Sequence, residues 1–156
     1  MPGGSVSLTV SGSIARFVIQ NPPLNILTND VRHAMLAHVN HLALQPEVSV
    51  AILESEGSTA FSAGSDIREF PHDEAGGLAK IRFEQHLLNR LAQLPQVVIA
   101  KLRGHVLGGG AELMLACDLR IADETTRIGF PEIRLGALPA AGGMKRLVRE
   151  IGPVKA

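Results

Sequence analysis

The sequence of 156 residues predicts an α/β domain with a largely parallel sheet, and three observations support this fold class. Hydrophobic residues make up 46% of the chain and charged residues 19%, which suits one compact core. Short apolar runs alternate with segments of helical spacing, the pattern of right-handed βαβ units. No low-complexity tract or clean internal repeat interrupts this alternation, so we expect a single domain over residues 1–156.

The chain opens with a predicted β-hairpin. Residues 5–10 (SVSLTV) and 15–20 (ARFVIQ) are short segments with β-branched side chains, as expected for two adjacent strands. The segment NPPLN, residues 21–25, then interrupts the strand pattern, because two consecutive prolines cannot sit inside a hydrogen-bonded ladder. A loop is therefore expected after the hairpin.

A helix is predicted after this loop. Four side chains recur on one of its faces at helical spacing: Val31, Met35, His38 and Leu42. Thr28 or Asn29 is placed to cap the first turn, and Pro46 ends the helix. Neither His38 nor His41 has an acidic or cysteine partner placed with it, so packing is a better interpretation of His38 than metal binding.

Three further segments predict strands of the parallel sheet. Residues 48–53 (VSVAIL) form a continuous apolar run, typical of a strand that is covered on both faces. Residues 97–102 (VVIAKL) predict a second buried strand, and residues 119–122 (LRIA) a third.

Two helices are expected between these strands. The first follows a loop over residues 54–67, has about four turns, and stops at Pro95. Three leucines mark it at helical spacing: Leu87, Leu91 and Leu94. The second helix begins at the glycine triplet 108–110, and Cys117 within its apolar sequence is interpreted as a small core residue.

Two glycine-containing loops follow predicted strands, and ligands of open α/β sheets usually lie beyond the carboxyl ends of the strands. One is FSAGSD, residues 61–66, and the other is GHVLGGG, residues 104–110. Neither has the spacing of a dinucleotide-binding or phosphate-binding loop. Glycines at a helix start expose backbone N–H groups, so the amide of Gly109 and one from the first loop could form an oxyanion hole.

Two carboxylates accompany these loops. Glu112 lies in the first turn of the helix that begins at the glycines, and Glu132 follows 20 residues later in GFPEIRLG. Burial could move the pKa of such a group toward the working pH and suit it to general acid or base catalysis. Taken singly, each feature is more commonly structural, because glycine often marks a turn and glutamate suits a first helical turn.

The order and spacing of these motifs resemble the crotonase family, the enoyl-CoA hydratase/isomerase superfamily. The matching segments are NPPLNILT at 21–28, FSAGSDI at 61–67, and the longer segments 98–122 and 128–147. The resemblance covers nearly all of the chain. It implies the crotonase-like spiral of ββα units, which is compatible with the α/β alternation above.

The resemblance also implies roles for individual residues. The backbone N–H groups of Ser65 and Gly109 match the positions that bind the thioester oxygen, and Glu112 and Glu132 match the two glutamates that hydratases use. Five further residues are implied in substrate binding: Ala63, Gly64, Asp66, Ile67 and Gly108. Because Ser65 would act through its amide, Ser65→Ala is expected to be mild if the side chain is idle.

This pattern implies an enoyl-CoA hydratase acting on a 2-enoyl-CoA thioester. Coenzyme A is then part of the substrate, and we expect no separate cofactor and no metal. In the family the chain continues past the position of Ala156 into a helical segment that packs in trimers, often as dimers of trimers. The sequence therefore corresponds to the family's N-terminal core, as a fragment or as a shortened member with a reduced role, and we expect an exposed apolar flank.

Composition argues against other classes of partner. The 15 basic and 15 acidic residues cancel and aromatic residues make up 3%, so we expect no nucleic-acid partner. The amino terminus lacks the pattern of a signal peptide, and the apolar runs are too short to span a membrane. We therefore expect no membrane partner and a cytoplasmic location, or an organelle matrix in a eukaryote.

The sequence leaves three alternatives open. An isomerase of the same family works with one principal carboxylate, so the presence of both Glu112 and Glu132 favours hydration. A thioester hydrolase or decarboxylase could use the same oxyanion-binding amides. A non-catalytic subunit, including an RNA-binding one, could have the same scaffold, although zero net charge counts against RNA. His105 precedes the glycine loop and could touch a ligand.

Overall fold

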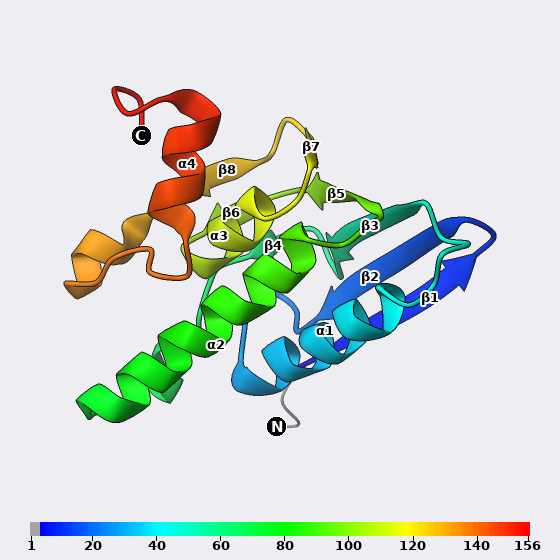
Figure 1. The fold of residues 1–156 in the computed structure, drawn as a ribbon. Helices are drawn as coiled ribbons and strands as arrows, with labels where there is room; N and C mark the ends of the chain where they lie inside the picture. Colours follow the sequence, from blue (N-terminus) through cyan, green and yellow to red (C-terminus); the bar gives the residue numbers. More distant parts are fainter. Residues whose placement is uncertain (1–3) are drawn as a thin grey trace.

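Two sheets of mostly parallel strands form the framework of the computed structural model, which describes residues 4–156 (Figure 1). The larger sheet has the order β1-β2-β3-β5-β7, with β1 (Ser5–Ser11), β2 (Ile14–Gln20), β3 (Val50–Ser55), β5 (Val97–Leu102) and β7 (Leu119–Ala122). The smaller sheet has the order β4-β6-β8, with β4 (Ala60–Ser62), β6 (His105–Leu107) and β8 (Arg127–Gly129). The first three residues of the predicted domain lie outside the described residues.

Helices follow the strands in a regular ββα order. The helices are α1 (Asn29–Leu42), α2 (Glu74–Ala92), α3 (Gly109–Leu115) and α4 (Gly143–Ile151), with short 3₁₀ turns η1 (Ile67–Glu69) and η2 (Pro131–Leu135). The units β3-β4-α2, β5-β6-α3 and β7-β8-α4 each place one strand in the larger sheet and one in the smaller. All strand pairs are parallel except the β1–β2 hairpin. The predicted fold class, α/β with a ββα spiral, is confirmed.

The helix α1 forms where the sequence predicts it, because the capping residue and the apolar face indicate the same segment. Oγ1 of Thr28 accepts a hydrogen bond from the Val31 amide at 3.2 Å and caps the first turn. The helix packs against β1 and α2, as Figure 1 shows. His38 is half-buried, and its Nε2 lies 2.9 Å from the carbonyl oxygen of Val6, so the interpretation of His38 as a packing residue is confirmed.

The helix α2 is longer than predicted. It has 19 residues, about five turns, and it ends at Ala92, so Leu94 lies beyond it. Its first turns were not predicted because they contain two glycines, Gly76 and Gly77, and glycine is a poor helix former. The carboxylate of Asp73 nevertheless accepts a hydrogen bond from the Gly76 amide at 2.8 Å and starts the helix.

The strands differ from the prediction in burial and in number. The segment 119–122 does form β7, but it is not buried: Ile121 is 62% exposed, because β7 is the edge strand of the larger sheet and pairs only with β5. β5 alternates between buried and exposed positions and is not covered on both faces, and β3 begins two residues later than predicted. The strands β4, β6 and β8 were not predicted, since three residues are too few to display a strand period.

The core lies between the larger sheet and the helices that cover it. Its largest fully buried side chains include Phe17, Phe61, Ile19, Met35 and Leu91. Apolar side chains near the end of the chain are exposed instead, among them Ile133 at 81% and Leu138 at 66%. The apolar flank expected from the sequence is therefore present.

Asn25 attaches the loop after β2 to the connection between β3 and β4. It is fully buried and adopts a left-handed φ of 48°. Its Nδ2 donates hydrogen bonds to the carbonyl oxygens of Glu56, at 2.9 Å, and Ala60, at 2.8 Å, and its Oδ1 accepts one from the Asn21 amide at 3.1 Å. Asparagine suits this position because its amide both donates and accepts hydrogen bonds. Its short polar side chain also tolerates the left-handed backbone conformation.

We predict that Asn25→Ala lowers the free energy of unfolding by about 3 kcal/mol, because two buried carbonyl oxygens and one amide lose a partner. Urea unfolding followed by circular dichroism measures the change. The control is Asn89→Ala in α2, where the side chain makes an exposed contact with Arg146, and it should change the value by less than about 0.5 kcal/mol. Equal urea midpoints for Asn25→Ala and Asn89→Ala would show that the hydrogen bonds of Asn25 do not stabilise the fold.

Candidate active site

A pocket of about 520 Å³ lies where the loop after β4, the helix α2, the start of α3 and the turn η2 meet. Eight of the nine residues that the sequence singles out line it: Ala63, Gly64, Ser65, Ile67, Gly108, Gly109, Glu112 and Glu132. They come from three segments that are far apart in the chain. The fold therefore brings the two glycine-containing loops and both glutamates to one place.

The two glycine-containing loops are in direct contact. Gly64 has a φ of +101°, and a Cβ at this position would lie 2.9 Å from the carbonyl oxygen of Leu107 and 3.3 Å from the Gly109 nitrogen. Its own carbonyl oxygen accepts a hydrogen bond from the Leu27 amide at 2.8 Å, which pairs the loop with the segment before α1. Within residues 4–156, neither the Ser65 amide nor the Gly109 amide donates a hydrogen bond to another residue. Both N–H groups are thus available to a ligand.

Each glycine of the triplet is needed for a different reason. Gly108 has a positive φ of 53°, and a Cβ there would lie 3.3 Å from Oε1 of Glu132. A Cβ at Gly109 would lie 3.1 Å from Oγ and 3.6 Å from the nitrogen of Ser65, so it would crowd the Ser65 side chain. At Gly110 a Cβ would come within 2.4 Å of the carbonyl oxygen of Ser62. A larger side chain would therefore separate the loops or fill the space between them.

Glu112 is buried in α3 with its carboxylate at this pocket. Its residue is 5% exposed, and its Oε1 accepts a hydrogen bond from the Gly143 amide at 2.8 Å. Burial raises its pKa to about 7, and the nearby charges of Glu84 and Glu132 add to the increase, while the Gly143 hydrogen bond opposes it. A carboxyl with this pKa can release or accept a proton near neutral pH.

Glu132 approaches the same pocket from η2. Pro131 occupies the first position of this turn, where its lack of an N–H is tolerated, and Glu132 follows it. Its Oε2 is buried and has no hydrogen-bond partner among the described residues. A buried carboxylate oxygen is costly without a partner, so this atom is available to a bound water or substrate.

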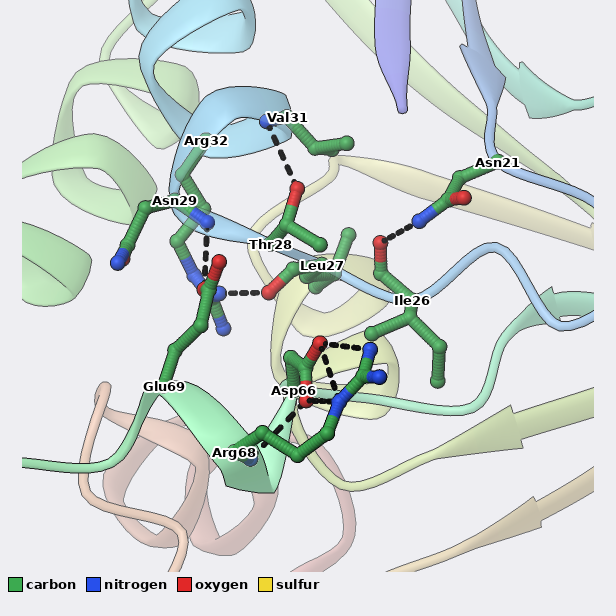
Figure 2. A network of polar contacts seen from close by, with 10 residues as sticks. All are labelled: Asn21, Ile26, Leu27, Thr28, Asn29, Val31, Arg32, Asp66, Arg68 and Glu69. Atoms are coloured by element: carbon green, nitrogen blue, oxygen red, sulfur yellow. Dashed lines mark hydrogen bonds and ion pairs between the residues drawn. The ribbon is translucent and has the colours of Figure 1, made fainter. Parts of the chain in front are cut away.

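Asp66 is the one residue implied in substrate binding by the family resemblance that does not line this pocket. Its carboxylate accepts hydrogen bonds from the amide and the guanidinium of Arg68, the latter at 2.6–3.2 Å, and it caps η1 (Figure 2). The side chain of Asp66 therefore shapes the loop. Its contribution to substrate binding through main-chain groups stays a prediction.

Three charged residues at the site were not predicted. The guanidinium of Arg32, on α1, is buried and pairs with Oε1 of Glu84 on α2 at 2.9 Å, and Glu84 also pairs with Lys80. Arg32 donates further hydrogen bonds to the carbonyl oxygen of Leu27 and to Oγ of Ser65. Sequence spacing could have indicated Arg32, because it lies on the apolar face of α1, where a charged side chain needs a buried partner.

The remaining candidates lie outside the pocket lining. His105 is exposed in β6 and is not among the residues that line the pocket. Cys117 is buried, and burial raises its pKa to about 12, so its interpretation as a core residue is confirmed. Residues 4–156 contain no cluster of three or more His, Cys, Asp or Glu side chains that could hold a metal ion. None of the helices in this part of the chain is both long and apolar enough to cross a bilayer.

Comparisons with known proteins identify relatives over nearly the same residues. The family model for enoyl-CoA hydratase/isomerase matches residues 9–156. The chain is 36% identical over 154 residues to a Bacillus subtilis protein named "Probable enoyl-CoA hydratase", covering 97% of the chain and 59% of that protein. It is 43% identical over 114 residues to an enoyl-CoA isomerase/hydratase of Mycosarcoma maydis, covering 72% of the chain and 41% of that protein.

Solved structures of enoyl-CoA hydratases are also similar to this chain. The crystal structure of an enoyl-CoA hydratase from Bacillus anthracis superposes with a TM-score of 0.91 at 31% identity, covering 97% of this chain and 60% of that one. The chain thus spans about three fifths of the length of these hydratase relatives.

We predict that Glu112 makes the stability of the chain depend on pH. Its pKa is about 7 in the folded state and 4.5 as the ordinary value, so the folded state binds the proton more tightly. The stabilisation is present below pH 4.5 and is lost as the pH rises through 7, a change of up to about 3 kcal/mol. Urea unfolding between pH 4.5 and 8 measures this slope.

Glu112→Gln should flatten the slope, because the amide keeps an oxygen for the Gly143 amide but does not ionise in this range. The exposed Glu124→Gln is the matched control and should leave the slope unchanged. A slope that is the same in all three proteins would show that Glu112 ionises normally in the folded state.

Proposed function

The chain belongs to the enoyl-CoA hydratase/isomerase family, and we propose that it is an enoyl-CoA hydratase, which adds water across the 2,3 double bond of a 2-enoyl-CoA thioester. One observation carries the proposal: two unpaired backbone amides and two carboxylates line the same pocket. Hydration needs both kinds of group, because it builds negative charge on the thioester oxygen and moves two protons.

The amides of Ser65 and Gly109 form the proposed oxyanion hole. When hydroxide from water bonds to C3, the electrons of the double bond move toward the thioester carbonyl, and its oxygen gains negative charge. Two N–H donors that are fixed before the reaction stabilise this charge without reorganising. The contact between Gly64 and the start of α3 supports this role, since it holds the two amides near each other.

The two glutamates move the protons. One carboxylate removes a proton from the attacking water as its oxygen bonds to C3, and the other delivers a proton to C2, which gives a 3-hydroxyacyl-CoA. The pKa of about 7 lets Glu112 act as either acid or base near neutral pH. The unpartnered Oε2 of Glu132 supports a position for the water between the two side chains.

The proposal extends to the substrate and the assembly. Coenzyme A enters as part of the substrate, and the chemistry above requires no separate cofactor or metal. The trimer or dimer of trimers is proposed for the full-length form from the resemblance to the family, and the exposed apolar side chains near the end of the chain, among them Ile133, leave surface for a further segment or another copy to cover.

Hydration is tested by following the loss of the conjugated enoyl-thioester absorbance with a short and a long 2-enoyl-CoA. We expect Glu112→Gln and Glu132→Gln each to lower kcat by at least about 100-fold, since each removes one general acid or base. The exposed Glu124→Gln should retain the activity of the unchanged chain.

The product separates the alternatives. Release of free thiol would indicate a hydrolase, and a shifted double bond would indicate an isomerase, the other activity in the name of the Mycosarcoma maydis relative. If neither substrate is hydrated and the two glutamine variants behave like the unchanged chain, the hydratase proposal is wrong. Retention of RNA on filters, weakening as salt is raised, would point to a non-catalytic member of the family.

A further inference from the structure

Arg32 is a buried cation that the proposed reaction does not use. Its residue is 4% exposed, and burial lowers its pKa, although Glu84 opposes this change. A buried guanidinium is costly, so its contacts must be good if the fold is to keep it. It makes three: the carbonyl oxygen of Leu27, Oγ of Ser65 at 2.7 Å, and Oε1 of Glu84 at 2.9 Å.

Two of these contacts hold the loop that carries the Ser65 amide. Leu27 and Ser65 form a parallel β-bridge, in which the Leu27 amide donates to the carbonyl oxygen of Gly64 at 2.8 Å. Arg32 donates to the carbonyl oxygen of Leu27 and to the hydroxyl of Ser65, so it joins both sides of this bridge. A Cβ on Gly109 would lie 3.6 Å from Nη2 of Arg32, so the guanidinium lies near the start of α3 as well as at the hydroxyl of Ser65.

The same loop has a second attachment to the start of α1. The amide of Asn29 donates a hydrogen bond to Oε2 of Glu69 at 2.7 Å, and Figure 2 shows this contact beside the one between Arg32 and Leu27. The Asn29 contact holds η1, which follows the loop, whereas only the Arg32 contact reaches Ser65 itself. Arg32 is therefore the link that acts directly on the residue with the amide.

We propose that Arg32 is a positioning residue for the oxyanion hole, which acts through the hydroxyl of Ser65 and the carbonyl oxygen of Leu27 to fix the Ser65 amide. This inference rests on the proposed function. Donors to a developing oxyanion must be held within a few tenths of an ångström, because a displacement of about 1 Å can cost about 100-fold in rate. The hydroxyl of Ser65 is then not idle, and the expectation that Ser65→Ala is mild is replaced by a measurable defect.

A purely structural role for Arg32 would give a different result. Arg32 and Glu84 join α1 to α2, so their loss could lower stability without moving the Ser65 amide. The test therefore needs a signal from the thioester carbonyl itself. The infrared carbonyl stretch of a bound thioester supplies it, because hydrogen bonds that polarise a carbonyl lower its stretching frequency.

The probe is butyryl-CoA with ¹³C at the carbonyl carbon, a saturated thioester that cannot be hydrated. The unchanged chain should lower the stretching frequency on binding. Arg32→Met and Ser65→Ala should both move it back toward the value in water, and Arg32→Lys, which keeps a shorter donor, should lie between. Hydration kcat should fall by about 10- to 100-fold in Arg32→Met while KM changes much less.

Two comparisons make the result specific to the Arg32–Ser65 contact. The double variant Arg32→Met/Ser65→Ala should be little worse than Arg32→Met alone, because both changes remove the same link. Arg90→Met is the control: Arg90 also joins α2 to α1, through an exposed contact with Asn40 at 3.1 Å, but it lies near the opposite end of α2 from the loop. It should leave both the frequency and kcat unchanged.

The outcomes separate this inference from the proposed function. If the unchanged chain does not lower the carbonyl frequency, the oxyanion hole itself is wrong. If it does, and Arg32→Met and Ser65→Ala lower the frequency equally and keep full kcat, Arg32 has no positioning role while the hydratase proposal stands. Should Arg32→Met fail to fold, Ser65→Ala decides alone, since it leaves the Arg32–Glu84 pair in place.

Discussion

The close approach of the loop after β4 to the first residues of α3 is the contact on which the site depends. Because Gly64 has no side chain, the Gly109 nitrogen can approach it closely. Gly110 likewise lacks a side chain, and this leaves room for the carbonyl oxygen of Ser62. These backbone groups belong to the smaller sheet and its connections, where β4 pairs with β6. The site is therefore a product of strand pairing, and any side chain larger than glycine at these positions would open it.

The acidic side chains Glu84 and Glu112 of the pocket have different partners. Glu84 contacts the cations of Arg32 and Lys80, whereas Glu112 receives a backbone N–H from Gly143. A neutral donor compensates a buried charge less than a cation does, so burial raises the pKa of Glu112 to about 7. The same pocket thus holds ion pairs that stabilise its walls and a carboxyl that is able to exchange protons.

The short second strands of the ββα units could not be predicted from the sequence. Each unit has the same order of elements, but β4, β6 and β8 have three residues each, and their side chains have little in common. The β7 strand was placed correctly but expected to be buried, since an apolar sequence does not reveal that a strand lies at the edge of its sheet. The hairpin, α1 and the parallel order were predictable, because period and capping are local properties.

The sequence by itself determined the fold class, the positions of the glycine-containing loops and the two glutamates, since motif spacing and hydrophobic period are written along the chain. Tertiary structure alone decided that Ser65, Gly109, Glu112 and Glu132 share one pocket, and that Arg32 reaches Ser65 from α1. The physical reason is separation along the chain: burial, ion pairing and the pKa of Glu112 depend on groups that are distant in sequence and meet only after folding, as Arg32 and Ser65 do across 33 positions.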